Sequence, residues 1–335
     1  MKVGKLSQVD LQRMLDTISI QDSRVLVGPK IGEDAAFIDS GDNILIAAAD
    51  PITFTSDRIG EYAVQINAND VAACGATPRW FLANVLLPTN YNIEEIHSLF
   101  TQMTNACNNL GASLIGGHTE VIDKIEQPII AGCMLGEVER NKEIRTAGAL
   151  PGDVIVITKG IAIEGTSILA REHSEHLEKI GISTEIVEKA KSLLDNPGIS
   201  IVKDAMTAVN AEAEIHAMHD LTEGGLATAL WELANAAEIG LRVDSRCIPI
   251  LGETAHICQL LNLDPMGLLA SGSLLITVPP AGVPFLVQDL FQEGISSSII
   301  GNCLPKSEGV RLTLPTGSVS VPTFERDELA RFINA

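Results

Sequence analysis

The stretch His219-Asp220-Leu221-Thr222-Glu223-Gly224-Gly225 places two carboxylates directly before a pair of glycines. An apolar-periodic segment, residues 226–237, follows at once and predicts a helix whose N-terminus faces this loop. Helix N-termini favour anions, so the stretch is a candidate cradle for a phosphate or a substrate. The alternative is a plain helix N-cap at Thr222. The stretch supplies two candidate catalytic residues, Asp220 and Glu223, and two candidate cofactor-binding residues, Gly224 and Gly225.

Acidic and amide side chains beside glycine or alanine recur earlier in the chain. They stand at Gly32-Glu33-Asp34-Ala35, at Asp50, at Asn67-Ala68-Asn69-Asp70 and at Gly116-Gly117-His118-Thr119-Glu120. Carboxylates are costly to bury without a cation or a hydrogen-bond partner. Small neighbours leave room for a ligand to approach the backbone. Together these features indicate magnesium-bridged phosphates, and hence a nucleotide site.

The composition limits the classes of partner. A chain of 335 residues is long enough for two domains, and its apolar fraction of 46% indicates compact cores. A net charge of -20 argues against nucleic acid and against an anionic membrane surface as partners. The same charge repels ATP unless a cation intervenes, and Mg²⁺ held by carboxylates supplies that cation.

The cysteines and the N-terminal segment favour a cytoplasmic protein. Six cysteines occur without a Cys-x-x-Cys pair, which is typical of reduced thiols in the cytosol. The first five residues lead into an amphipathic segment and not into the apolar core of a signal peptide. No window is long enough to span a membrane without proline, glycine or charge.

Periodicity and turn signals predict an α/β or α+β chain. In the first half we expect helices at 6–18, at 57–74 with a cap at Ser56 or Asp57, and at 93–110. We expect strands at 35–38, 44–49, 81–87 and 129–138, and a strand stub at 114–115 that delivers a Gly116-Gly117 turn. In the second half we expect strands at 154–158, 241–243, 273–278 and 298–300, and helices near 165–180, 184–195, 198–210 and 226–237. Turn residues at 147–153 predict domains over 1–148 and 149–335.

Three carboxylates are candidate magnesium ligands. Asp34 and Asp50 end strand-like runs, and Asp70 shares a helix face with Asn67. Lys30 and Gly32 precede Asp34, and with Asn67 they are candidate cofactor-binding residues. The alternatives are an internally satisfied pair for Asn67 and Asp70, and a solvated loop position for Lys30.

The Gly-Gly-His-Thr-Glu motif at residues 116–120 is a second candidate anion site. Two glycines after a strand let backbone N–H groups face an anion, so Gly116, Gly117 and Thr119 are candidate cofactor ligands. His118 and Glu120 are a candidate proton-transfer pair or metal and water ligands, and a core histidine is the alternative. The segment 160–167 has P-loop glycine spacing but carries Thr166 where the phosphate-binding lysine must stand, so we reject a Walker site.

In this order the motifs resemble the ATP-dependent superfamily of aminoimidazole ribonucleotide (AIR) synthetase (PurM), formylglycinamidine synthetase, thiamine-monophosphate kinase, selenophosphate synthetase and the hydrogenase-maturation protein HypE. Residues 218–227 and Asp264-Pro265 look most like the HypE type. The resemblance implies two α/β domains and a homodimer in which the N-terminal domains form a β-barrel. It also implies ATP and Mg²⁺ at Asp34, Asp50 and Asp70, and ATP-dependent phosphorylation of a carbonyl, amide or phosphate oxygen.

The chain departs from two of these types, HypE and selenophosphate synthetase. It ends Arg331-Phe332-Ile333-Asn334-Ala335, without the carrier cysteine of the HypE type, and Glu223 stands where that type usually has arginine. No cysteine precedes Cys74, so the early reactive residue of selenophosphate synthetases is missing. We therefore expect a HypE-like enzyme with a small-molecule or carrier-bound substrate. The alternatives are a non-catalytic nucleotide-binding maturation factor with a maturation-protein partner, and, disfavoured by the few histidines, a dinuclear metallohydrolase.

Overall fold

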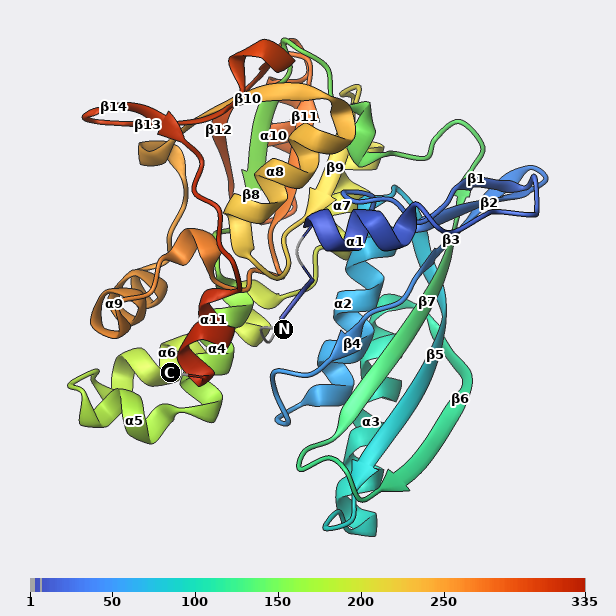
Figure 1. Cartoon of the computed structure of the whole chain (residues 1–335), viewed down its shortest axis with the longest axis vertical. Coiled ribbons are helices and arrows are strands. Elements are labelled where there is room, and N and C mark those ends of the chain that lie inside the picture. Colours follow the sequence, from blue (N-terminus) through green and yellow to red (C-terminus); the bar gives the residue numbers. More distant parts are fainter. Residues whose placement is uncertain (1–3, 7, 335) are drawn as a thin grey trace.

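The computed structural model describes residues 4–6 and 8–334, and its strands form two separate mixed sheets (Figure 1). The first sheet contains strands from residues 25–139 and the second contains strands from residues 154–320. This arrangement confirms the predicted mixed α/β class. The domain boundary between residues 148 and 149 stays a prediction.

The first sheet has the order β1-β2-β3-β7-β5-β6, and β4 pairs with β7. Its strands are β1 Val25–Val27, β2 Ala36–Ser40, β3 Asn43–Ala48, β4 Pro51–Ile52, β5 Thr77–Pro88, β6 Ser113–Ile122 and β7 Ile129–Glu139. The β5–β6 pair is parallel and the other pairs are antiparallel. The hairpin of β2 and β3 turns at Gly41 and Asp42, between the strands predicted at 35–38 and 44–49.

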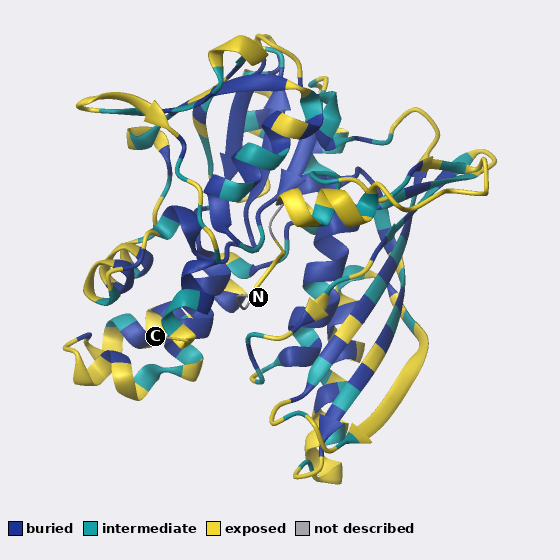
Figure 2. Cartoon of the chain, viewed as in Figure 1, coloured by how far each residue is buried: buried dark blue, intermediate teal, exposed yellow. Residues whose placement is uncertain are grey.

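Helices α2, Ile59–Ala73, and α3, Ile93–Leu110, pack together against the first sheet, while the short helix α1 spans Gln8–Leu15. Helix α3 has the predicted bounds because its ends carry strong local signals. Asn92 and Glu95 form a capping box at the N-terminus, and Gly111 ends the helix in the left-handed conformation. Helix α2 is buried over nearly its whole length (Figure 2), because alanines and other small residues let its neighbours approach.

The second sheet has the order β14-β13-β10-β12-β8-β11-β9. Its strands are β8 Val154–Thr158, β9 Ala217–Asp220, β10 Ile239–Asp244, β11 Leu274–Val278, β12 Ser297–Pro305, β13 Val310–Leu314 and β14 Gly317–Ser320. The helices of this half are α4 Ile163–Glu172, α5 Ser174–Lys179, α6 Thr184–Ser192, α7 Val202–Asn210, α8 Gly225–Ala237, α9 Gly252–Leu261, α10 Val283–Gln292 and α11 Glu328–Ile333. Single helical turns lie at Thr146–Gly148, Leu194–Gly198, Ser245–Cys247, Pro265–Gly267 and Lys306–Glu308.

The two halves share one hydrophobic core. Buried side chains of α2, such as Val64, belong to the same cluster as Ile168 and Leu169 of α4. A polar clamp adds to this contact, because Asn69 of α2 donates to the Ile199 carbonyl and accepts from the Ile201 N–H, each at 2.8 Å. These contacts fix the sheets relative to each other and define the geometry of any site between them.

Three local predictions are wrong. Helix α2 begins after Arg58, which adopts a left-handed conformation and pairs with Glu61 and Asp195, so neither Ser56 nor Asp57 caps it. Gly116 and Gly117 lie inside the continuous strand β6 and form no turn. The helix predicted near 165–180 is divided at His173 into α4 and α5. Within the described part of the chain, no helix is long and apolar enough to cross a membrane.

Candidate active site

Four carboxylates from separate parts of the chain meet where the two halves join. Asp34 precedes β2, Asp50 lies between β3 and β4, Asp70 is on α2, and Asp220 ends β9. Helix α2 contacts both β3 and β9, and this contact brings the four together. We call them the acidic cluster. Three of them are the predicted magnesium ligands and the fourth is a predicted catalytic residue.

His219 ties the acidic cluster to helix α8. Its Nδ1 lies 2.7 Å from Asp34 Oδ1 and its Nε2 lies 3.2 Å from Glu232 Oε2, with only 4% of the side chain exposed. Burial alone would lower the pKa of His219, but Asp34 and Glu232 outweigh it and raise that pKa well above the usual value. Because both ring nitrogens are engaged, His219 acts as a fixed cation that orients Asp34 and not as a metal ligand.

Asn67 positions the backbone at Asp50. Its Oδ1 accepts from the Asp50 N–H at 2.8 Å, and its Nδ2 donates to the carbonyls of Asp50, at 3.1 Å, and Ala63, at 2.9 Å. The side chain is therefore bonded to the backbone and not to Asp70, so the expected alternative of an Asn67–Asp70 pair is not what the structure shows. Cofactor binding by Asn67 stays a prediction.

The charged forms of the remaining carboxylates, Asp50, Asp70 and Asp220, are disfavoured by their surroundings. Burial, followed by the neighbouring carboxylates, raises the pKa of Asp70 well above its usual value, and burial and Asp34 raise the pKa of Asp50. The pKa of Asp220 is raised to about 8, chiefly by burial and by Asp34. Oxygen Oδ2 of Asp220 is buried and has no hydrogen-bond partner among the residues that the structure describes. An all-oxygen donor set with an unpartnered buried oxygen fits Mg²⁺, which prefers carboxylates together with phosphate and water oxygens.

Lys5 is a site residue that the sequence does not reveal. Its backbone N–H donates to Glu223 Oε1 at 2.8 Å, and its Nζ donates to Thr222 Oγ1 at 3.1 Å. Burial lowers the pKa of Lys5, but Glu232 and Asp50 outweigh it, so the net shift is upward. No motif surrounds this lysine, and its partners lie more than two hundred residues away along the chain. The predicted catalytic residue Glu223 thus holds the N-terminal segment against the acidic cluster.

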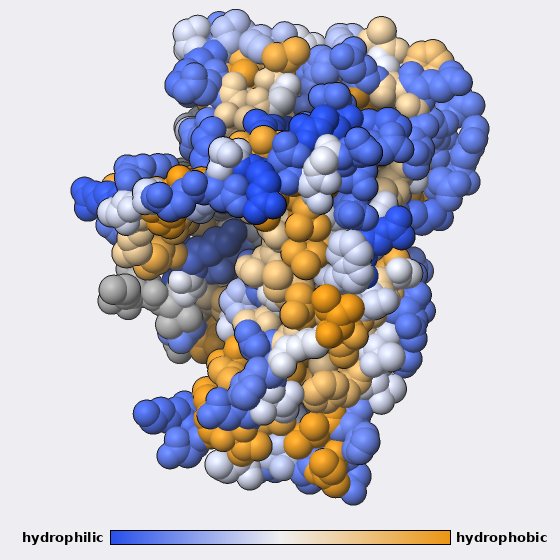
Figure 3. All heavy atoms as spheres, turned by 90° about the vertical axis from the view of Figure 1, so that its right-hand side faces the viewer, coloured by the Kyte–Doolittle hydropathy of each residue, from blue (hydrophilic) through white to orange (hydrophobic). Residues whose placement is uncertain are grey.

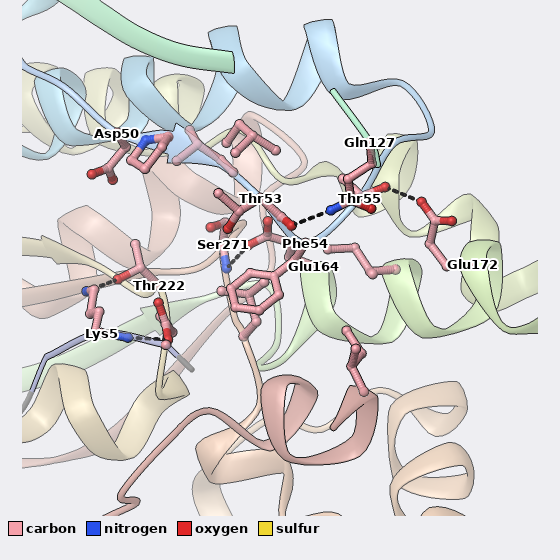
Figure 4. Close-up of a pocket in the computed structure, with 18 of the residues that line it drawn as sticks. Lys5, Asp50, Thr53, Phe54, Thr55, Gln127, Glu164, Glu172, Thr222 and Ser271 are labelled. Atoms are coloured by element: carbon pink, nitrogen blue, oxygen red, sulfur yellow. Dashed lines mark hydrogen bonds between the residues drawn. The ribbon is translucent and has the colours of Figure 1, made fainter. Parts of the chain in front are cut away.

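A cavity of about 710 Å³ extends away from the acidic cluster. Its near end is marked by Asp50 and Lys5 and its far end by Glu172, with Glu164 and Ser271 between them (Figure 4). We call it the first cavity. Apolar side chains form much of its wall, namely Ile52, Phe54, Ile66, Ile168, Leu269 and Ile333. Its size suits a nucleotide, with a polar end for phosphates and an apolar body for a base.

A second cavity, of about 510 Å³, adjoins the first through Lys5 and Glu223, which line both. The predicted residues Lys30 and Gly32 line this second cavity, together with Trp231 and Arg326. Lys30 and Arg326 make no ion pair with the residues that the structure describes. The two cavities therefore meet at Lys5 and Glu223.

The residues predicted at 116–120 lie away from the acidic cluster of the same chain. Strand pairing places His118 beside Asn84, Asn84 beside Ala131, and Ala131 beside Pro51, the neighbour of Asp50. Three strand spacings amount to about 14 Å. His118 and Glu120 are 70% and 57% exposed and lie 3.7 Å apart. Their catalytic roles, and cofactor binding by Gly116, Gly117 and Thr119, stay predictions.

The two glycines at the start of α8, Gly224 at the N-cap and Gly225 as the first helical residue, are tightly packed. The Gly224 N–H donates to Asp327 Oδ2 at 2.6 Å, so this N–H is already used. A Cβ at Gly225 would lie 2.6 Å from the Met266 carbonyl oxygen, and Gly225 also has a positive φ. Close packing explains the glycines at this helix start, and their predicted binding of a cofactor stays untested.

Comparison with known proteins gives matches over both halves. Residues 32–138 match the AIR synthase related protein, N-terminal domain, and residues 151–312 match the C-terminal domain of the same family. A protein of Methanocaldococcus jannaschii named for hydrogenase expression and formation is 28% identical over 292 residues, which cover 85% of this chain and 83% of the relative. Carbamoyl dehydratase HypE of Rhizobium leguminosarum is 27% identical over 256 residues, which cover 75% of this chain and 70% of the relative.

Solved structures share the fold. HypE in complex with ATP superimposes with a TM-score of 0.73 at 21% identity, covering 96% of this chain and 91% of that one. A chain from a crystal structure of a HypE–HypF complex gives a TM-score of 0.74 at 19% identity, covering 95% of this chain and 100% of that one. ThiL complexed with AMPPCP and TMP gives a TM-score of 0.71 at 17% identity, covering 97% of this chain and 96% of that one. The two-domain architecture is therefore shared by proteins with different names and ligands.

Proposed function

Because the chain belongs to the AIR synthase related family, we propose that it is an ATP- and Mg²⁺-dependent enzyme that phosphorylates an oxygen atom of a small or carrier-bound substrate, as a HypE-like activating enzyme. The acidic cluster carries this proposal. The cluster lies beside a cavity of nucleotide size, and Asp70 and Asp220 are buried in it. The pKa values of Asp50, Asp70 and Asp220 are raised, and Asp220 Oδ2 has no hydrogen-bond partner among the described residues. Such a cluster is stable in its charged form when a cation binds it.

In this proposal Asp34, Asp50, Asp70 and Asp220 hold Mg²⁺, and the nucleotide occupies the first cavity with its phosphates toward them. Bound Mg²⁺ supplies neutralisation of the charge between phosphates and carboxylates, which a chain of net charge -20 requires. The names and ligands of the relatives support this reading, since curated relatives are called carbamoyl dehydratase and HypE has been solved with ATP.

The chain's own residues then orient and transfer the phosphoryl group. Glu232 and His219 fix the carboxylate of Asp34, and Lys5 Nζ offers a positive charge to the phosphates. A substrate oxygen attacks the γ-phosphorus as the bond to the ADP oxygen breaks. The second cavity meets the first at Lys5 and Glu223, so it offers a route by which the acceptor can reach the γ-phosphate from the side opposite ADP.

The buried thiol of Cys303 does not suit the role of an acceptor. Cys303, the last cysteine of the sequence, is fully buried in β12, and burial raises its pKa to about 12. A buried thiol of that pKa is a poor nucleophile. Cys303 is therefore not the reacting group in this proposal, which keeps a substrate of small-molecule or carrier-bound type.

A second candidate is a nucleotide-dependent maturation factor that binds a partner protein without turnover. The complex of HypE with HypF supports it, because a protein of this fold assembles with a second maturation protein. A homodimer is part of either proposal. Strand β6 is an unpaired edge of the first sheet, and Ile115 and Val121 on it are 53% and 57% exposed. Apolar side chains also gather on this side of the molecule (Figure 3).

Isothermal titration with ATP, with and without Mg²⁺, tests the proposal when it is combined with an assay of phosphate release. We expect Mg²⁺-dependent binding and slow formation of ADP in the wild type. Asp70→Asn should abolish Mg²⁺-dependent binding, whereas Asp16→Asn, on an exposed turn after α1, should leave it unchanged. Unchanged binding by Asp70→Asn would reject the metal assignment. Tight binding without turnover in the presence of candidate acceptors would favour the maturation factor.

A further inference from the structure

Glu164 is a buried carboxylate in the wall of the first cavity that the proposed phosphoryl transfer does not use. It lies in the first turn of α4 and is 3% exposed. Among the described residues its only hydrogen-bond partner is Ser271, whose backbone N–H lies 3.3 Å from Oε2. A carboxylate offers about four acceptor sites. Most of its hydrogen-bonding capacity is therefore free to meet a ligand.

The surroundings of Glu164 give the fold no reason to keep a charge there. The adjacent wall includes the apolar side chains of Ile168, Leu269 and Phe54. No cation pairs with Glu164 among the described residues, and burial raises its pKa to about 7. A glutamine or leucine would satisfy packing at lower cost. A perturbed carboxylate in a cavity wall is typical of a ligand-binding residue.

Its position along the cavity identifies the part of the ligand that it meets. Figure 4 shows Glu164 and Ser271 between the end marked by Asp50 and Lys5 and the end marked by Glu172. In a nucleotide whose phosphates face the acidic cluster, the sugar follows the phosphates and the base comes last. The middle of the cavity therefore receives the sugar.

We propose that Glu164 is a specificity-determining residue that accepts hydrogen bonds from the ribose hydroxyls of ATP and selects ribonucleotides over 2′-deoxynucleotides. The inference rests on the proposed function and adds to it the residue that recognises the sugar. A carboxylate can accept from both hydroxyls of a vicinal diol, and an acidic residue holds the ribose in the same manner in dinucleotide-binding folds.

Glu172, the carboxylate at the far end of the cavity, already has hydrogen-bond partners. Glu172 Oε1 accepts from the Thr55 hydroxyl at 2.7 Å, from the Ser56 N–H at 2.9 Å and from the Asp57 N–H at 3.3 Å. It orders the loop before α2 and has less capacity for a ligand. Glu164 is therefore the better acceptor for the sugar.

The test compares the binding of Mg·ATP, Mg·2′-deoxyATP and Mg·ITP to the wild type, Glu164→Gln and Glu164→Ala by calorimetry. A hydrogen bond to a charged acceptor predicts that the wild type binds ATP roughly 10- to 100-fold more tightly than 2′-deoxyATP. This preference should shrink several-fold in Glu164→Gln and approach unity in Glu164→Ala. ITP, which lacks the exocyclic amine, should follow ATP in all three proteins. Glu164→Gln is nearly isosteric and gives the answer if the alanine variant does not fold.

The outcomes separate the inference from the proposed function. Wild-type protein that binds ATP and 2′-deoxyATP equally, or Glu164→Gln with full discrimination, would overturn the role of Glu164 alone. A preference lost for ITP and not for 2′-deoxyATP would assign Glu164 to the base and overturn its assignment to the ribose. No binding of Mg·ATP by the wild type would overturn the proposed function, and this inference with it.

Discussion

Replacing Glu164 with glutamine should stabilise the ligand-free protein at high pH and not at low pH. Burial raises the pKa of Glu164 from the usual 4.5 to about 7. Between these values the folded protein keeps a proton that the unfolded chain releases, so the free energy of unfolding falls as the pH rises through this window. Below pH 4.5 both states hold the proton and the effect vanishes. Above pH 7 the full effect, about 3 kcal/mol, is reached.

The assay is urea unfolding of the wild type and Glu164→Gln at pH 5 and pH 8, without nucleotide or divalent metal. Glutamine does not titrate, so its free energy of unfolding relative to the wild type should increase by about 2 to 3 kcal/mol between these two pH values. Glu172→Gln is the matched control from the same cavity. Although burial opposes it, hydrogen bonds from Thr55, Ser56 and Asp57 lower the pKa of Glu172, so its contribution to stability is present above pH 4.5.

The two variants should therefore respond with opposite signs. Glu172→Gln should lose stability relative to the wild type at pH 8 and recover it as the pH falls through the depressed pKa. A gap between Glu164→Gln and the wild type that stays constant from pH 5 to pH 8, or that narrows as the pH rises, would refute the assignment of Glu164 as a strained buried acid.

Two further substitutions test the frame of the site. Lys5→Ala should weaken Mg·ATP binding by about ten-fold in a salt-dependent manner, because it removes a positive charge near the proposed position of the phosphates. Calorimetry at two salt concentrations measures this effect. Lys306→Ala, a substitution of an exposed lysine, is the control and should leave binding unchanged. Asn69→Ala should lower the free energy of unfolding by about 2 to 4 kcal/mol, because the Ile199 carbonyl and the Ile201 N–H lose their hydrogen-bond partner. Urea unfolding measures this change. A loss below about 1 kcal/mol would contradict the stabilising role of the polar clamp.

Local chemistry explains which elements the sequence could predict. Helix α3 has its predicted bounds because Asn92, Glu95 and Gly111 act within one turn of its ends. The acidic residues were predictable as a group because each breaks the apolar or small-residue pattern of its segment. That four of them meet required the contacts of α2 with both sheets, which no local window contains.

The failures have an equally physical cause. Gly116-Gly117 has the composition of a turn, yet a Cβ at Gly117 would lie 1.9 Å from the Ala83 carbonyl oxygen, so glycine serves close strand packing there. The residues around Lys5 and Glu232 do not predict a role in the site. Lys5 contacts Glu223, which is 218 residues away along the chain. Glu232 contacts His219 because of the way α8 is oriented. Glu164 lies in a segment whose local signal is its P-loop-like glycine spacing, and its burial follows from the packing of α4 against the other half.

The two kinds of buried acid in this site restrict the ligand more than either does alone. Asp34, Asp50, Asp70 and Asp220 repel one another and any free anion, so they need a cation. Glu164 stands apart in an apolar wall, where a neutral hydroxyl or amine donor suits it better than a metal. A ligand that satisfies both must present metal-bridged anionic oxygens at one end and neutral donors one sugar length away. A metal-bound ribonucleotide has this layout, whereas a free metal ion or an inorganic phosphate would leave Glu164 buried without a partner.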